Sequence, residues 1–249
     1  MKKKYTKSKK YKKKKSILKN RFFFYLISII FLILFFYYFF IFSNVFQVRT
    51  IQVKGEQFNS KEDIISIVEP FLEKRIIFKT ESIFLINTNH IKNNLIERFP
   101  SINHIKVSKI LPRRILINIT ERIPKIVIRY QGKDYLIDEQ GLIFKKREKE
   151  YDLPLIISQE TFNINDIVLS ISLVKKITEI DKYLEPEYFD FEEKDIVANI
   201  GNTRFIFDVQ KSIDQQIDDL LLLLERYELK IENLEYVDLR FDKIFYREK

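Results

Sequence analysis

The chain has 249 residues, enough for one large domain or two small ones, and it lacks cysteine, which excludes disulfide bonds, thiolate catalysis and cysteine-based zinc sites. Its formal charge of +9 comes from one end, because residues 1–21 hold 12 Lys and Arg and no acid, whereas residues 22–249 hold 32 Lys and Arg against 35 Asp and Glu. A nucleic-acid-binding domain would keep a basic face within its folded part, so we expect no nucleic-acid partner.

An uncharged stretch of 21 residues follows the basic tail, from Phe22 to Phe42. As a helix it would be ~31 Å long, which matches the hydrocarbon core of a bilayer. Tyr25, Tyr37 and Tyr38 lie toward its ends, where aromatic side chains favour the membrane interface. A buried soluble helix would not be apolar all round. A cleaved signal peptide would end in small residues, whereas this run ends in Phe-Ser-Asn-Val-Phe, so we expect an uncleaved membrane anchor.

The flanking charges predict the orientation of this anchor. Twelve cations precede the span, and the residues just after it, 43–47, carry none. The positive-inside rule therefore predicts a cytoplasmic tail and places everything after residue 43 outside the cytoplasm. The lysines also suit attraction to anionic lipid.

The residues after the span predict a strand followed by two helices. Alternating apolar side chains before Gly55 indicate the strand, and they are Val48, Ile51 and Val53. Ser60 to Asp63 has the pattern of a capping box for the first helix, which Pro70 ends or kinks. Thr88 is the expected cap of the second helix, which Pro100 closes. The side chains expected to face inward from the two helices are Ile64, Ile67, Val68, Phe71, Ile91, Leu95, Ile96 and Phe99.

An antiparallel hairpin is predicted next. Ile105 and Val107 alternate with polar residues in its first strand. A turn follows at 111–114, with Pro112 at a favoured position. The second strand has one isoleucine face made of Ile115, Ile117 and Ile119. The element order is β-α-α-β-β.

Residues 123–249 predict a second small α+β domain. Strands at 126–130 and 135–137 precede Asp138 to Gly141, where Asp138 reads as a turn residue and Gly141 can take a positive φ before a further strand. Amphipathic helices are predicted over 165–184 and after Ser212 as cap. Their inward positions are Ile167, Ile171, Val174, Ile177, Ile180, Leu184, Ile213, Ile217, Leu220, Leu221 and Leu224. The remaining predicted strands are 188–191, 196–200, 204–209 and 234–245.

In this order the segments resemble the FtsQ/DivIB family of bacterial cell-division proteins. Phe99-Pro100, Glu121-Arg122 and Pro124 frame the hairpin as in that family, and Tyr236 to Phe241 is similar to the family's ending of aromatic-x-D-L-R-aromatic. The other matching positions are Phe46, Val48, Ile51, Val53, Gly55, Ile102, Ile105, Val107, Pro112, Ile115, Ile117 and Ile119. The chain departs from the pattern at Phe207-Asp208, where members often have a glycine before the penultimate helix.

This resemblance implies an α+β fold with a single N-terminal transmembrane helix, a POTRA domain and a mixed-sheet β domain with flanking helices. The implied parts are a basic cytoplasmic tail (1–21), the transmembrane helix (22–42), a β-α-α-β-β POTRA domain (46–122) and an FtsQ-type β domain (123–249). It also implies a single-pass type II protein of the cell membrane, located at the division septum.

The function implied by the resemblance is that of a divisome scaffold without enzymatic activity and without a cofactor. It would recruit FtsB (DivIC)-like and FtsL-like bitopic proteins and help regulate septal peptidoglycan synthesis, with the septal peptidoglycan synthase complex as a further candidate partner. The expected mechanism is addition of a partner strand to an exposed sheet edge. The resemblance places that edge at the C-terminal strand, at Arg240, Phe241, Lys243 and Phe245. The alternative is that Leu239, Phe241 and Phe245 are core residues.

The sequence offers no recognisable catalytic motif. His90 and His104 are too few for most transition-metal sites, and four glycines do not provide a phosphate-binding loop. The two Ser-x-x-Lys matches, at Ser16 and Ser172, lack a Lys-Thr-Gly partner. Two other functions remain open, namely a POTRA-bearing, membrane-anchored factor of another export or envelope-assembly system and an anchored envelope hydrolase that uses carboxylates alone.

Overall fold

The structure, a computed structural model, describes residues 21–55, 58–75, 79–192 and 195–249. The lysine-rich tail predicted over residues 1–21 lies, apart from Arg21, outside the described residues. Packing divides the chain into two compact units. The first contains the chain up to Gln52 with Ile65–Ile91 and Val107–Ile117, and the second contains Val53–Ile64, Lys92–Lys106 and Asn118–Lys249.

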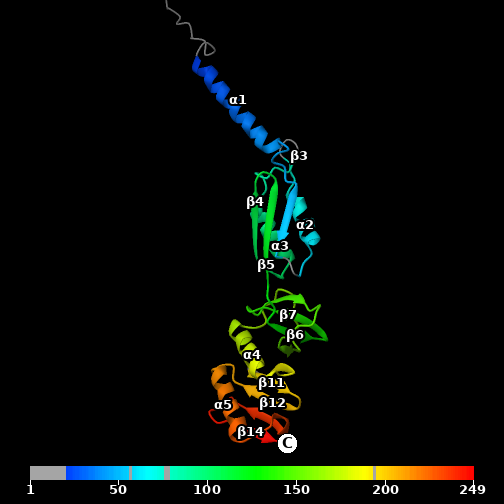
Figure 1. Cartoon of the computed structure of the whole chain (residues 1–249), viewed down its shortest axis with the longest axis vertical. Coiled ribbons are helices and arrows are strands. Elements are labelled where there is room, and N and C mark those ends of the chain that lie inside the picture. The colour runs from blue at the N-terminus through cyan, green and yellow to red at the C-terminus, as the bar shows by residue number, and fades with distance from the viewer. Residues whose placement is uncertain (1–20, 56–57, 76–78, 193–194) are drawn as a thin grey trace, which may run out of the picture. The chain divides into compact units, whose positions relative to one another are not determined.

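The predicted span forms helix α1 (Arg21–Phe42), which leads the described chain in Figure 1. By length and composition it can cross a membrane. Nearly all of its side chains are exposed, and Ile41 in its last turn is buried. An apolar helix whose side chains are not packed against other residues of the protein needs apolar surroundings. Helix α1 therefore has the character of a membrane anchor.

A three-stranded sheet follows, with strand order β1-β5-β4. Its strands are β1 (Thr50–Lys54), β4 (Ile102–Ile110) and β5 (Arg114–Glu121). The isoleucine face predicted for β5 is confirmed, because Ile115, Ile117 and Ile119 are buried. Gly55, after β1, has a φ of 88°, and a Cβ atom there would lie 2.1 Å from the Ile119 carbonyl oxygen, so only glycine fits.

The two predicted helices are α2 (Lys61–Val68), extended by the 3₁₀ turn η2 (Glu69–Phe71), and α3 (Thr88–Arg98). The short strands β2 (Lys74–Arg75) and β3 (Lys79–Thr80) lie between them in sequence and pair with each other. Ser60 caps α2 as predicted, since its Oγ accepts a hydrogen bond from the Asp63 N–H at 3.1 Å.

Two details of α3 were predicted wrongly. The cap is Asn87 and not Thr88, because Asn87 Oδ1 accepts from the N–H groups of Asn89 (3.1 Å) and His90 (3.2 Å). Ile96 is exposed, whereas Ile91 and Leu95 are buried. Residues four apart share a helix face, and Ile96 is turned about 100° away from Leu95.

The second sheet is mixed and has nine strands in the order β14-β13-β12-β11-β10-β9-β6-β7-β8. Strand β9 pairs in parallel with β6 and β10, and β12 pairs in parallel with β13. Its strands are β6 (Ile126–Tyr130), β7 (Lys133–Ile137), β8 (Ile143–Lys146), β9 (Leu155–Ile157), β10 (Tyr188–Glu192), β11 (Asp195–Ile200), β12 (Thr203–Phe207), β13 (Leu234–Asp238) and β14 (Phe245–Glu248).

Helices α4 (Ile171–Leu184) and α5 (Ile213–Arg226) contribute to one core with this sheet. Figure 1 shows both helices beside β11 and β12. The 3₁₀ turn η3 (Ile231–Asn233) leads from α5 into β13. The core contains Val174, Ile177, Ile180, Phe189, Ala198, Phe205, Phe207, Ile217, Leu220 and Val237. The inward positions Ile171 and Leu221 were predicted wrongly, because both are exposed.

Helix α4 begins later than predicted. Ser170 is its cap, with Oγ accepting from the Leu173 N–H at 3.2 Å, so the helix starts at Ile171 rather than Asn165. Asn165 instead has a φ of 81°, and Ile167 is exposed and forms a bridge with Leu142. The cap predicted at Ser212 is confirmed, since its Oγ accepts from the Gln215 N–H.

The strand predicted over residues 234–245 is wrong as a single element. Strand β13 ends at Asp238, residues 239–244 turn the chain, and β14 returns antiparallel to β13. Asp138 is a turn residue as expected. Its Oδ1 accepts from the N–H groups of Gln140 and Leu142, and its carbonyl oxygen accepts from the N–H of Gly141, whose φ is 79°.

Candidate partner-binding edge of the nine-stranded sheet

Strands β14 and β8 form the two ends of the large sheet. The outer side of β8 is occupied at its first residue, because the Ile143 N–H donates to the Asp166 carbonyl at 2.9 Å and the Ile143 carbonyl accepts from the Asn165 N–H at 2.7 Å. Within the described part of the chain, no further strand pairs with the outer side of β14. A sheet edge of this kind presents backbone groups that a strand from another protein can pair with.

Cross-strand pairing shows where the side chains of β14 point. Phe245 lies opposite Asp238, and Tyr246 lies opposite Val237, a residue of the core. Neighbouring strand residues point to opposite faces, so Phe245 lies on the face away from the helices. Tyr246 lies on the helix side, where its ring is 6.5 Å from that of Tyr227 at the end of α5.

An exposed aromatic pair flanks this edge. Phe241 and Phe245 are 56% and 53% exposed, and their ring centroids lie 5.6 Å apart in an edge-to-face arrangement. The Arg240 guanidinium carbon lies 5.7 Å from the centroid of the Phe241 ring. The alternative that these phenylalanines are core residues is therefore wrong, although Leu239 is buried.

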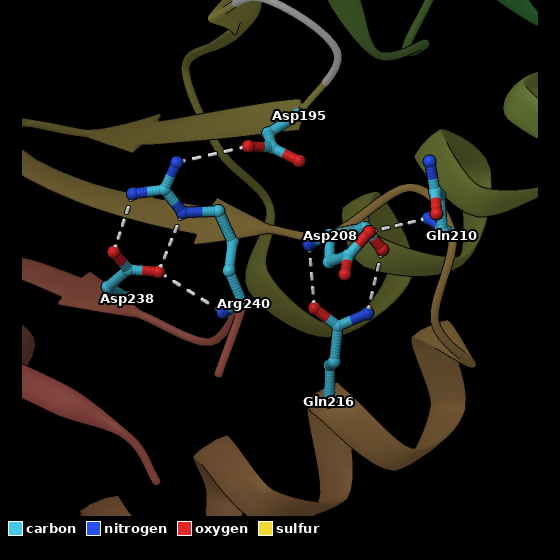
Figure 2. A network of polar contacts seen from close by, with 6 residues as sticks. All are labelled: Asp195, Asp208, Gln210, Gln216, Asp238 and Arg240. Atoms are coloured by element: carbon cyan, nitrogen blue, oxygen red, sulfur yellow. Dashed lines mark hydrogen bonds and ion pairs between the residues drawn. The ribbon is translucent and has the colours of Figure 1, made fainter. Parts of the chain in front are cut away.

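Arg240, next to this aromatic pair, makes the hydrogen bonds shown in Figure 2. Its Nε and Nη2 donate to the two carboxylate oxygens of Asp238 at 2.9 and 2.7 Å, and its Nη1 donates to Asp195 Oδ2 at 3.1 Å. Its backbone N–H also donates to Asp238 Oδ1. Planar, bidentate pairs of this kind are directional, so they fix the chain as it leaves β13.

Arg240 and Asp238 each stabilise the charged form of the other. Hydrogen bonds to Asp238 and then Asp195 raise the pKa of Arg240 above its usual range. Burial opposes ionisation of Asp238 most strongly, but the hydrogen bonds and charge of Arg240 outweigh burial and leave the pKa of Asp238 below its ordinary value. Stability from this pair is therefore present above the ordinary carboxyl pKa and is lost as pH falls through the lowered pKa.

A second polar contact in Figure 2 fixes the end of β12 to α5. The buried Gln216 side chain accepts from the Asp208 N–H at 2.8 Å and donates to the Asp208 carbonyl at 3.0 Å. Asp208 Oδ1 also accepts from the Gln210 N–H at 2.7 Å. These bonds satisfy the backbone where Phe207-Asp208 departs from the glycine of the family pattern.

The structure thus brings together three of the four predicted docking residues, Arg240, Phe241 and Phe245. Lys243 is exposed in the connection between β13 and β14. Sequence reasoning missed Tyr246 and Arg247, which share the edge strand with Phe245. Asp242-Lys243 as a turn, followed by Phe-Tyr-Arg-Glu, was the available signal for a separate final strand.

Neither histidine belongs to this edge strand. The His90 ring on α3 packs against Phe71 at 5.0 Å, and His104 is exposed on β4. Across the described ranges, no group of three or more His, Cys, Asp or Glu residues is arranged to hold a metal ion.

The three-stranded sheet and the mixed sheet, with one helix among the described residues that can cross a membrane, define a class of protein, namely one that carries a POTRA domain and a β domain behind a candidate anchor. The POTRA domain, FtsQ-type, family model matches residues 46–122. The chain is 25% identical over 211 residues to the cell division protein DivIB of Clostridium tetani, covering 79% of this chain and 77% of that protein. It is 36% identical over 105 residues to the cell division protein FtsQ of Chloroflexus aggregans, covering 42% of this chain and 35% of that protein.

The chain therefore carries an FtsQ-type POTRA domain and is similar over most of its length to a DivIB cell division protein. The family resemblance seen in the sequence is confirmed. These matches favour cell division over the alternative of another export or envelope-assembly system.

Proposed function

We propose that this protein is a non-catalytic, bitopic scaffold of the division complex that recruits FtsB/DivIC-like and FtsL-like partners and helps regulate septal peptidoglycan synthesis. Its tail would be cytoplasmic, and its POTRA domain (46–122) and β domain (123–249) would lie outside the cytoplasm at the septum. The FtsQ-type POTRA match and the similarity to DivIB support the process, and the charge difference across α1 supports the orientation.

The observation that carries the proposal is the open edge of β14 beside two exposed phenylalanines. A partner strand would gain affinity from backbone hydrogen bonds to this edge and selectivity from contacts with Phe241 and Phe245. Arg240 would act as a positioning residue, because its bonds to Asp238 and Asp195 hold the connection that carries Phe241. Membrane anchoring of both partners raises their effective concentration, so a small interface suffices.

The test is the affinity of the full chain, in detergent or nanodiscs, for the FtsB/DivIC-like protein of the same organism. Phe245→Lys is expected to weaken binding about tenfold or more, since aromatic anchors dominate such interfaces. Leu222→Lys is the matched control, because Leu222 is also an exposed apolar residue but lies on α5. Equal affinities for Phe245→Lys, Leu222→Lys and the unchanged chain would refute this docking site.

A further inference from the structure

The C-terminal end of α1 is fixed to the folded residues that follow it. The Ile41 carbonyl accepts from Thr80 Oγ1 at 2.8 Å and from Gln47 Nε2 at 3.0 Å, and the Phe40 carbonyl accepts from Ser82 Oγ at 3.0 Å. The last carbonyls of a helix lack partners within the helix, and here side chains supply them. Within the first unit, the anchor therefore continues into the residues that follow it without a free linker.

Aromatic rings surround this junction. The rings of Phe40, Phe46 and Phe84 lie 5.2 to 5.5 Å apart in all three pairs, and Phe84 is 43% exposed. A helix of 22 residues is ~33 Å long, slightly more than a hydrocarbon core of ~30 Å, so its last turn lies at the membrane interface when α1 spans a bilayer. Aromatic side chains concentrate at that depth.

The tip of the β4–β5 hairpin lies beside the same junction. The Arg49 N–H donates to the Arg113 carbonyl at 3.0 Å, and Lys109 Nζ donates to the Phe84 carbonyl at 3.3 Å. A shallow pocket at the tip is lined by Val45 and residues 110–114. Val45, Ile110 and Leu111 are all exposed, with Leu111 at 59%.

Basic side chains accompany these apolar ones. Arg49, Lys109, Arg113 and Arg114 are exposed, and the segments 43–49 and 109–114 contain no acid. Glu81 is an exposed acid in the neighbouring segment. Apolar groups with adjacent cations suit the boundary between acyl chains and anionic headgroups.

We propose that Val45, Phe84, Ile110 and Leu111, with the four adjacent cations, form a juxtamembrane surface that lies in the headgroup layer of the bilayer spanned by α1. Its partner is an anionic lipid surface, which is continuous with the surroundings of the anchor. The proposal rests on α1 being a membrane span, but it does not depend on partner recruitment or on the orientation of the chain. Contact at this surface would hold the first unit against the membrane through a second attachment beside α1.

The chain contains no tryptophan, so single introduced tryptophans can report depth. The full chain is reconstituted into vesicles of phosphatidylcholine and phosphatidylglycerol, with and without brominated acyl chains, which quench nearby tryptophan emission. Leu111→Trp tests the surface, Phe31→Trp in the middle of α1 tests the span, and Tyr227→Trp, an exposed residue after α5, is the control.

Brominated lipid is expected to lower the emission of Leu111→Trp about twofold and to quench Phe31→Trp at least as strongly, because an interfacial group lies about 5–10 Å into the boundary. Tyr227→Trp is expected to change little. Quenching of Phe31→Trp alone, or equal quenching of Leu111→Trp and Tyr227→Trp, would overturn the juxtamembrane surface while leaving the anchor in place. No quenching of Phe31→Trp would instead refute the span.

Two further measurements separate lipid from protein contacts. Replacing phosphatidylglycerol by phosphatidylcholine is expected to reduce quenching of Leu111→Trp, since the four cations favour anionic headgroups. Unchanged quenching would overturn the role of the cations. Shielding of Leu111→Trp from aqueous iodide without quenching by bromine would show that protein covers the surface, and it would overturn the proposal.

Discussion

Nη1 of Arg240 lies 3.1 Å from Oδ2 of Asp195, so a side chain that follows β13 reaches β11 across the intervening strand β12. The same guanidinium binds Asp238 through two nitrogen atoms. Arg240 thus links β13 to β11 next to the sheet edge that we propose as the docking site. Loss of these contacts should lower the stability of the protein and also shift the position of Phe241.

Arg240→Lys is expected to lower the free energy of unfolding by about 1–2 kcal/mol, because an ammonium group cannot reproduce the bidentate pair. Arg247→Lys is the control, since Arg247 contacts Glu235 at 3.5 Å on the surface and such pairs contribute less than about 1 kcal/mol. Urea unfolding of the full chain in detergent measures both variants. Equal losses would contradict the structural role given to Arg240.

Asp181 in α4 should make the protein less stable at neutral pH. Burial, with the charges of Asp152 and Glu185, raises the pKa of Asp181 to about 6. A carboxyl group whose pKa is higher in the folded state binds more protons there than in the unfolded state between pH 4 and 6. The free energy of unfolding therefore falls as pH rises through this window.

Asp181→Asn is therefore expected to stabilise the protein by about 1 kcal/mol at pH 7, a value reduced from the full shift because the group is only half-buried. At pH 4 the variant and the unchanged chain should have nearly equal stability. Thermal unfolding at both pH values measures the difference, and stabilisation of the same size at pH 4 would show that charge is not its cause.

Gly141 and Gly132 offer a matched pair for backbone effects. Both have positive φ, but a Cβ at Gly141 would lie 1.9 Å from the Leu169 carbonyl oxygen, whereas nothing lies within 4 Å at Gly132. Gly132→Ala should lower the free energy of unfolding by about 1–2 kcal/mol, because alanine is strained in the left-handed backbone conformation. Gly141→Ala should cost several kcal/mol more, since backbone atoms must move. Similar unfolding midpoints for the two variants would refute the close contact.

The proposed orientation predicts the fate of a reporter at the C-terminus. Alkaline phosphatase, which is active only outside the cytoplasm, should be active when fused after Lys249. Replacing the lysines of residues 2–15 by glutamine should weaken this orientation, because the charge difference across α1 is then reduced. If the fusion after Lys249 is no more active than a control reporter kept in the cytoplasm, the predicted topology is wrong.

Periodicity predicted most of the fold, because each predicted strand or helix hides one regular face. The isoleucines of β5 are buried at the spacing that the sequence shows, and so are Val174, Ile177 and Ile180 of α4. The order of the elements carried the family resemblance, and the resemblance supplied the process. Local chemistry also identified Ser60 and Ser212 as helix caps.

The errors arose where two local signals competed. Asn87 and Thr88 are both good caps, and only hydrogen-bond geometry distinguishes them. Residues 165–167 continue the helical pattern of α4 but pair with β8 and the residue before it, a tertiary interaction that periodicity does not contain. The turn at 239–244 lacks glycine and proline, so the sequence predicted one strand where the structure has the hairpin of β13 and β14. The role of Arg240 depends on Asp195, which is 45 residues away in sequence.

Hydrogen exchange of the full chain in nanodiscs, with and without the FtsB/DivIC-like protein of the same organism, tests the central claim most directly. Strand addition predicts that alternate backbone amides of β14 exchange at least about tenfold more slowly in the complex, because they gain hydrogen bonds. Amides of β8, where Ile143 already pairs with residues 165 and 166, should not change. Unchanged exchange in β14, with protection at β8 or β4 instead, would contradict the proposed docking edge.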